Sequence, residues 1–233
     1  MLRALLFDVQ GTATDFHSTV CDEAKRISAG RHPEADWPEV VRRWRAGYFT
    51  ALEAAERRGA GWGSVHSVYR HALDTVLDDC GIAGFSDAEH EELTLAWQRL
   101  RPWPDVVPGL VRLKRAHTLA TLSNADVSAV VNISKRAGLP WDAIFAAEMA
   151  GVFKPDPAIY HLAATYLGLD PAEIMMVASH KYDIRAAGRV GFATAFVARP
   201  LEFGPDGEAD VAFSDEFDVN ASDFLDLAAQ LGC

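Results

Sequence analysis

A single aspartate near the start of the chain has the surroundings of a catalytic carboxylate. The stretch 4–15 reads ALLFDVQGTATD, so an apolar run delivers Asp8 and is followed at once by Gly11 and Thr12. A short apolar run of this kind is typical of a buried strand. An aspartate at its end can attack an electrophilic carbon or phosphorus and form a covalent intermediate.

Three later segments carry polar residues that could serve such a nucleophile. TLSNAD contains Ser123 and Asn124, GVFKPDPAIY contains Lys154, and MMVASHKYD ends in Asp183. A lysine can keep a carboxylate ionised and neutralise charge that develops during hydrolysis. Ser123 and Asn124 can donate hydrogen bonds to a substrate oxygen. Asp183 can orient the lysine or a water, or ligate a metal if Asp8 also does.

Alternating strands and helices are expected to bring these segments together. Hydrophobic patterning predicts strands at 4–9, 118–122, 143–146, 175–178 and 194–197, with helices at 125–137, 157–167 and 182–190 between the later ones. This alternation indicates an α/β fold with a doubly wound parallel sheet. Ligands bind such sheets at the carboxyl ends of their strands, where the candidate residues stand.

The segment from about residue 18 to residue 101 interrupts this alternation with helical patterning alone. Helices are predicted at 40–58, 66–80 and 87–100, and Val41, Trp44, Tyr48 and Leu52 share one face of the first. The segment is therefore a helical insertion between the first strand and the rest of the sheet. Near the other end of the chain, the acidic stretch 206–218 is predicted to form a surface loop around a short last strand.

Composition narrows the class of protein. The 233 residues are 49% hydrophobic and 24% charged, as in ordinary globular proteins, and contain no apolar run long enough to span a membrane. No signal peptide is apparent, and three widely spaced cysteines favour a reducing cytoplasm. The net charge of −11 argues against a nucleic-acid partner, although a local cation could still bind a small anionic substrate.

The segments FDVQGT, TLSNAD, FKPDPAIY and MMVASHKYDIRAAGRVGFATAFVARP resemble, in order, the four motifs of the haloacid dehalogenase superfamily. Within it, they look like the type II 2-haloacid dehalogenases. The resemblance covers nearly the whole chain. It implies a Rossmann-like core domain formed by 1–14 and 102–233, an α-helical cap domain formed by 15–101, and a site between them.

The resemblance also implies a reaction. Asp8 would displace halide from the α-carbon of a 2-halocarboxylate, and water would then hydrolyse the aspartyl ester, with no metal or cofactor. Lys154 and Asp183 would set the electrostatics and the hydrolytic water. The residues expected to bind the substrate are Gln10, Thr12, Arg45, Ser123, Asn124, Tyr160 and His180, of which Arg45 and Ser123 would hold its carboxylate. Formation of a homodimer is also expected to be possible for such a protein.

Four positions depart from the family pattern. Two of them are Lys181, where the family often has asparagine or alanine, and Tyr182, where it has tryptophan; the other two, Gln10 and His180, belong to the expected site. The phosphatases of the superfamily have a general-acid aspartate where this chain has Gln10, and the dehalogenases usually have an aromatic residue there. An amide transfers no proton at neutral pH. His180 replaces the asparagine of the typical dehalogenase motif. Three alternatives stay open at this stage: ring opening of azetidine-2-carboxylate with an amine as leaving group, a Mg²⁺-dependent phosphatase, and a binding protein without catalysis.

Overall fold

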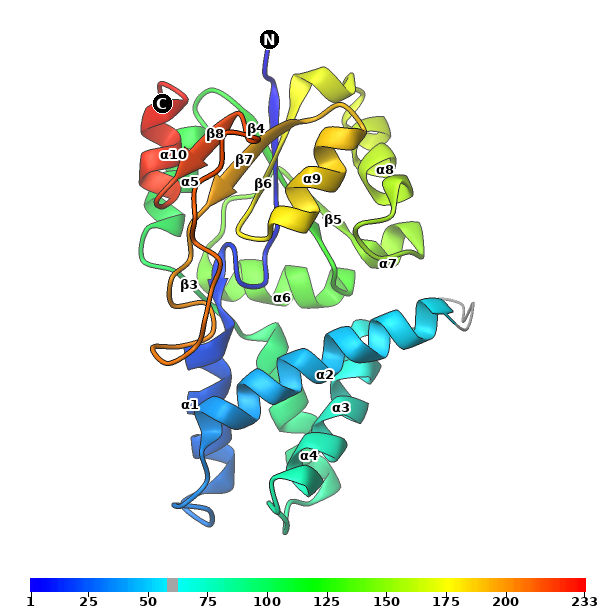
Figure 1. Cartoon of the computed structure of the whole chain (residues 1–233), viewed down its shortest axis with the longest axis vertical. Helices are drawn as coiled ribbons and strands as arrows, with labels where there is room; N and C mark the ends of the chain where they lie inside the picture. The colour runs from blue at the N-terminus through cyan, green and yellow to red at the C-terminus, as the bar shows by residue number, and fades with distance from the viewer. Residues whose placement is uncertain (58–62) are drawn as a thin grey trace.

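The computed structural model describes residues 1–57 and 63–233 and is built around one parallel sheet (Figure 1). The strand order is β5-β4-β1-β6-β7-β8. The strands are β1 (Ala4–Phe7), β4 (Thr118–Ser123), β5 (Ala143–Ala146), β6 (Ile174–Ala178), β7 (Ala193–Val197) and β8 (Val219–Ala221). The predicted doubly wound α/β fold is confirmed. Since β1 pairs with β4 on one side and β6 on the other, residues after these three strands meet at one edge.

Helices cover the sheet on both sides. They are α5 (Val106–Leu113), α6 (Val127–Ala137), α7 (Ala147–Ala150), α8 (Pro157–Leu167), the short η2 (Pro171–Glu173), α9 (Lys181–Arg189) and α10 (Phe224–Gln230). Figure 1 shows α5 and α10 together on the left of the sheet and α8 and α9 on the right. Both faces of the sheet are therefore buried, which explains the continuous apolar runs of its strands.

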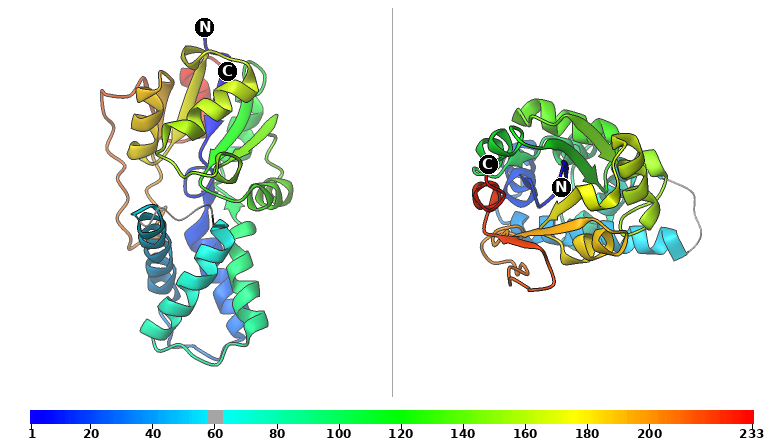
Figure 2. Two further views of the ribbon diagram at one scale, coloured as in Figure 1. Left: turned by 90° about the vertical axis from the view of Figure 1, so that its right-hand side faces the viewer. Right: turned by 90° about the horizontal axis from the view of Figure 1, so that it is seen from above.

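A helical layer lies below the carboxyl edge of the sheet (Figures 1 and 2). It consists of α1 (Phe16–Ser28), α2 (Trp37–Arg57), α3 (Val65–Asp79), α4 (Asp87–Thr94) and the 3₁₀ turn η1 (Leu95–Gln98). The chain enters it through β2 (Thr14–Asp15) and leaves it through β3 (Arg101–Pro102), and these two segments pair antiparallel. The helical layer, called the cap below, thus faces the point where Asp8 emerges.

Stacked aromatic rings fill the interior of the cap. The rings of Tyr48 and Tyr69 lie 4.5 Å apart and those of Tyr69 and Trp97 lie 4.1 Å apart, both nearly parallel. The indole N–H of Trp44 donates to the backbone oxygen of Tyr69 at 2.8 Å. The stack joins α2, α3 and η1, which gives the cap an apolar centre next to the site.

Several predicted elements differ from the observed ones. The first strand ends at Phe7, two residues earlier than expected, and the helix predicted at 87–100 divides into α4 and η1. The predicted end of the long cap helix, Arg58, lies outside the described residues. The prediction for 206–218 was wrong in one respect: the acidic stretch contains no strand, and β8 follows it.

The sequence prediction also missed α5. Its residues VVPGLVRL contain Pro108 and Gly109, which are unfavourable inside helices. Pro108 lies in the first turn, where a missing N–H does no harm. Gly109 lets α10 approach closely, because a Cβ at this position would lie 2.6 Å from Phe224 Cβ. The helix α5 is therefore stabilised by packing against α10, and the sequence pattern of residues 106–113 alone does not reveal this contact.

Candidate active site

Three of the predicted residues form one buried charge cluster. Asp8 directly follows β1, Lys154 lies before α8, and Asp183 lies in the first turn of α9. Lys154 Nζ contacts Asp8 Oδ1 at 3.0 Å and also pairs with Asp183. All three side chains are buried. The ammonium thus bridges two carboxylates.

The charges in this cluster set the state of the nucleophile. Burial by itself raises the pKa of Asp8, but the cations of Lys154 and His180 more than offset it and hold that pKa well below its usual range. Burial likewise disfavours the charged ammonium of Lys154, and the carboxylates of Asp183 and Asp8 raise its pKa above the ordinary value. Asp8 is therefore ionised at neutral pH and ready to act as a nucleophile.

Backbone contacts fix the lysine in place. Its Nζ also donates to the Leu122 carbonyl at 2.9 Å. The Asn124 side chain donates to the Lys154 carbonyl at 3.1 Å and accepts from the Lys154 N–H at 2.7 Å. Both ends of the Asn124 amide are thus used to hold the lysine segment. The expected substrate contact of Asn124 stays a prediction, while its positioning of Lys154 is visible in the geometry.

Tyr160 takes a similar place beside the second carboxylate. Its hydroxyl donates to Asp183 Oδ1 at 2.6 Å, and the residue is completely buried. Burial, and then the negative charge of Asp183, raise the pKa of Tyr160, which keeps the hydroxyl protonated as a donor. Complete burial, together with the charge of Asp8, raises the pKa of Asp183. The Tyr160 hydroxyl faces Asp183, and its expected contact with substrate stays a prediction.

The second oxygen of the nucleophile is also held. Thr12 Oγ1 donates to Asp8 Oδ2 at 2.9 Å and lies 3.0 Å from Ser179 Oγ. The Ser179 N–H donates to the same threonine oxygen at 2.9 Å. His180 Nδ1 approaches Asp8 Oδ2 at 3.3 Å. Thr12 and His180 therefore contact the nucleophile itself, and Ser179, which was not predicted, orients Thr12.

His180 belongs to an ion pair that the sequence did not suggest. Its Nε2 lies 2.7 Å from Glu202 Oε1, and Glu202 is buried. Burial by itself lowers the pKa of His180, but the charge of Glu202 and the contact with Asp8 outweigh it and raise that pKa to about 10. The imidazole is therefore a cation at neutral pH. Glu202 stands in the uncharacteristic segment PLEFG after β7, so no motif marks it.

Gln10 and Arg45 meet across the boundary between core and cap. Arg45 on α2 donates through Nη1 to Gln10 Oε1 at 3.0 Å and also pairs with the Tyr69 hydroxyl. The Tyr69 hydroxyl in turn donates to Gln10 Oε1 at 3.2 Å. The carbonyl oxygen of Gln10 thus has two polar partners. The Arg45 guanidinium also lies 4.7 Å from the centre of the Phe49 ring.

Two buried donors are left for a ligand. Ser123 Oγ and Arg45 Nε are buried and have no hydrogen-bond partner among the residues that the structure describes. A buried polar group without a partner costs roughly 1–3 kcal/mol, so a bound anion would relieve both. Ser123 ends β4 beside β1, and Arg45 contacts Gln10, two residues after the nucleophile.

A hollow of about 390 Å³ leads to the charge cluster from outside. It is lined by Phe49, Leu52, Asn124, Phe153, Lys154, Pro155 and Tyr182. Its walls are mostly apolar and come from α2 of the cap, from loops of the core and from the first turn of α9. The volume suits a small organic molecule rather than a polymer.

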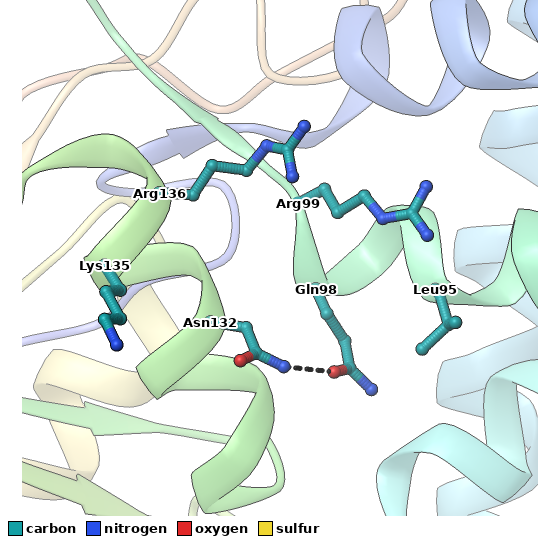
Figure 3. A pocket seen from close by; sticks show the side chains of 6 residues that line it. All are labelled: Leu95, Gln98, Arg99, Asn132, Lys135 and Arg136. Carbon is teal, nitrogen blue, oxygen red and sulfur yellow. Dashed lines mark hydrogen bonds between the residues drawn. The ribbon is translucent and has the colours of Figure 1, made fainter.

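A second hollow, of about 430 Å³, lies apart from this cluster (Figure 3). It runs between η1 and α6, where Asn132 Nδ2 donates to Gln98 Oε1 at 2.9 Å. Arg99 in its wall already pairs with Glu23 at 3.1 Å and with Glu92 at 3.3 Å. None of the predicted site residues lines this hollow.

The donor set of the charge cluster is unfavourable for a metal ion. The Lys154 ammonium stands between the two carboxylates that a divalent cation would need. Within 1–57 and 63–233, no group of three or more histidine, cysteine, aspartate or glutamate side chains could hold a metal. The same ranges contain no helix that is both long and apolar enough to cross a membrane.

Comparison with known proteins places the chain in a family. Residues 2–191 match the family model described as haloacid dehalogenase-like hydrolase. The chain belongs to this family. An (S)-2-haloacid dehalogenase of Xanthobacter autotrophicus is 33% identical over 202 residues, which cover 85% of this chain and 76% of that protein. The corresponding enzyme 4A of Burkholderia cepacia is 30% identical over 88% of both chains.

Solved structures of family members agree over the whole chain. A defluorinating L-2-haloacid dehalogenase is 38% identical with a TM-score of 0.94, covering 100% of this chain and 96% of that one. The Xanthobacter autotrophicus enzyme with covalently bound chloropropionic acid is 27% identical with a TM-score of 0.82, covering 100% and 99%. The resemblance read from the four motifs is therefore confirmed at the level of family and fold.

Proposed function

We propose that this protein hydrolyses the carbon–halogen bond of small 2-halocarboxylates through an ester on Asp8. The observation that carries the proposal is the Lys154 ammonium, which lies 3.0 Å from Asp8 Oδ1 and also pairs with Asp183. An aspartate that is buried and kept ionised by neighbouring cations is a nucleophile that few water molecules can solvate.

The first step displaces halide. A carboxylate oxygen of Asp8 attacks the α-carbon from the side opposite the halogen, and the halide leaves with the electron pair of the broken bond. Ser123 Oγ and Arg45 Nε, which lack partners in the described structure, would hold the substrate carboxylate and orient the α-carbon. The apolar hollow beside Phe49 and Tyr182 would admit the small acid.

The surroundings of Gln10 favour halide over an amine as leaving group. An ammonium or amine leaving group needs a hydrogen-bond acceptor, but Gln10 Oε1 already accepts from Arg45 at 3.0 Å and from Tyr69 at 3.2 Å. The Gln10 amide can therefore offer its Nε2 as a donor, which suits a departing anion. A phosphatase reaction is disfavoured for a separate reason, since Gln10 supplies no proton.

The second step returns the enzyme to its starting state. Water adds to the carbonyl carbon of the Asp8 ester, and the 2-hydroxy acid leaves. Lys154 neutralises the negative charge that develops on the ester oxygens in this step. Asn124 and Tyr160 act as positioning residues, the first through the Lys154 backbone and the second through Asp183.

Purified protein incubated with (S)-2-chloropropionate and, separately, with azetidine-2-carboxylate tests the proposal. We expect chloride release and no ring opening. Single-turnover reaction in ¹⁸O-water should place the label in Asp8, and Asp8→Asn should abolish turnover. Asp87→Asn, at the exposed start of α4, is the matched control and should keep full activity. Ring opening without halide release, or an active Asp8→Asn variant, would contradict the proposal.

Several finer properties stay proposals. The relatives' names support (S)-enantiomers as substrates. Three free cysteines agree with a reducing cytoplasm as the location. We also propose residues 1–14 and 102–233 as the core domain and 15–101 as the cap domain. A homodimer and the absence of a nucleic-acid partner remain expectations from the sequence.

A further inference from the structure

Beyond helping Lys154 to keep Asp8 ionised, the ion pair between His180 and Glu202 has no task in the displacement of halide. Halide leaves on the side of the α-carbon that is opposite Asp8, whereas His180 Nδ1 lies beside Asp8 Oδ2 at 3.3 Å. The other ring nitrogen, Nε2, lies 2.7 Å from Glu202 Oε1. One ring thus joins the nucleophile to a buried carboxylate that the first step does not use.

Glu202 is held firmly in this position. It lies in a turn after β7 in which its N–H donates to the Arg199 carbonyl at 3.1 Å. Arg199 is anchored through Nε to the Thr12 carbonyl at 2.7 Å and through both terminal nitrogens to Asp105 at 2.8 and 2.9 Å.

The backbone next to the nucleophile is also shaped around Glu202. Gly11 has a φ of +96°, and a Cβ at this position would lie 2.3 Å from Glu202 Oε1. A side chain at position 11 would therefore push Glu202 away from the imidazole. The loop that follows Asp8 can therefore pack closely against the Glu202 side chain only if residue 11 is a glycine.

Building on the proposed function, the geometry points to His180, oriented by Glu202, as the general base that takes a proton from the water that hydrolyses the Asp8 ester. A base must lie within hydrogen-bond reach of that proton. A nitrogen 3.3 Å from a carboxylate oxygen can share a hydrogen bond with a water that approaches the adjacent carboxylate carbon. Glu202 is a positioning residue, since it acts through the ring.

The charges around the ring explain why His180 becomes a base only after halide has left. In the free enzyme the ring stands between the carboxylates of Asp8 and Glu202, which keep it protonated. Other polar groups near the ring include Tyr182, whose ring centre lies 5.9 Å from that of His180, and Thr12 and Lys154, which both contact Asp8. The next residue, Lys181, pairs with Asp210. Esterification removes the charge of Asp8, so the pKa of His180 falls and the ring loses its proton more easily, while Glu202 continues to raise that pKa.

The steps balance as follows. Alkylation of Asp8 releases halide with its electron pair, and the imidazolium of His180 then gives one proton to solvent. Water oxygen bonds to the ester carbon while Nδ1 takes a water proton. The tetrahedral intermediate collapses, and that proton passes to the oxygen of the departing hydroxy acid. The Asp8 carboxylic acid finally protonates His180. The sum is haloacid plus water giving hydroxy acid, halide and one proton.

Rapid-quench kinetics of His180→Gln with (S)-2-chloropropionate separates the two steps. We expect a burst of chloride equal to the enzyme concentration at a rate within about threefold of wild type. Ester hydrolysis should be at least about a hundredfold slower, as removal of a general base predicts. Intact-protein mass spectrometry should therefore show the alkylated enzyme accumulating. In His180→Ala, added imidazole should restore hydrolysis.

Glu202→Gln provides the second variant. Removing the charge of Glu202 lowers the pKa of His180. In a plot of the ester-hydrolysis rate against pH, the fall in rate on the acid side should therefore move to lower pH. Loss of a merely structural contact would not produce this shift. Equal slowing of both steps in His180→Gln, or hydrolysis at the wild-type rate, would overturn the role of His180. If wild-type protein itself releases no chloride, the proposed function fails instead, so the two failures are distinct.

Discussion

Asp126 links the core to the cap, and replacing it should destabilise the protein strongly. Its Oδ1 accepts from the Val65 N–H at 2.8 Å and its Oδ2 from the His66 N–H at 2.8 Å. These are two of the N–H groups at the start of α3 that no residue of that helix can satisfy. Ser64 serves only the next one, the N–H of Ser67, at 3.1 Å.

The expected loss in Asp126→Ala follows from these contacts. A hydrogen bond to a charged group contributes about 1.5–3 kcal/mol. The contact with Val65 is buried and would be lost in full, whereas the contact with His66 is partly buried and water can replace it in part. We therefore expect the free energy of unfolding to fall by about 2–4 kcal/mol. For a protein of this size that lowers Tm by roughly 5–15 °C.

Urea unfolding followed by circular dichroism measures this loss. Ser86→Ala is the matched control, because Ser86 caps the exposed helix α4 and its loss should cost only about 0.5–2 kcal/mol. Asp126→Asn should be intermediate, since one oxygen remains as an acceptor. If Asp126→Ala were no more harmful than Ser86→Ala, the assignment of Asp126 as a link between core and cap would be refuted.

Two further measurements test the packing and the charges. Gly109→Ala should lower Tm and reduce the free energy of unfolding by about 1–3 kcal/mol, because the new Cβ would lie 2.6 Å from Phe224 Cβ. Gly47→Ala in α2 should raise Tm, because the new Cβ would lie 3.6 Å from Ala72 Cβ, an ordinary contact, and alanine favours a helix more than glycine does. The pKa of His180 is about 10 when folded, against an ordinary 6.5, so its stabilising contribution is complete below about pH 6.5 and disappears as the pH rises through 10. Urea titrations from pH 6.5 to 10 should therefore show a steeper fall in stability for wild type than for His180→Gln; parallel curves would contradict the charged state of the ring.

The charge cluster was predictable because its members stand at the ends of strands or near the start of a helix. Asp8 follows β1, Ser123 ends β4, and Asp183 opens α9 after β6. A parallel sheet brings such positions together whatever their separation along the chain. Lys154 needed more than topology, since its ammonium reaches Asp8 only because Asn124 holds its backbone.

Choosing Arg45 among three arginines of one helix depended on the family resemblance, and the structure gives a physical reason. Arg42 and Arg43 donate to Glu39 on the same helix, at 3.0 and 2.9 Å; Arg43 is exposed and Arg42 is half-buried. Arg45 is buried and turns toward Gln10. Helical periodicity alone distinguishes the two faces only when the apolar side is known.

Glu202 and Tyr69 could not be found from the sequence because their partners are distant and unmarked. Glu202 follows the last long strand in a loop whose path depends on Arg199 and Asp105. Tyr69 lies on a cap helix where an aromatic residue serves packing equally well. Each is connected to the site through a residue that lies in one of the sequence motifs. Glu202 contacts His180, and Tyr69 contacts Gln10.

Gln10 is best understood as one member of a three-residue unit with Arg45 and Tyr69. Its carbonyl oxygen satisfies donors from α2 and α3, so an aromatic residue at this position would leave both without their acceptor. Among the described residues, the buried Arg45 cation would then keep its contacts with the Tyr69 hydroxyl and with the aromatic rings around it. An aromatic residue at position 10, which the family resemblance led us to expect, would therefore remove the acceptor that Gln10 provides for the Tyr69 hydroxyl and for Arg45.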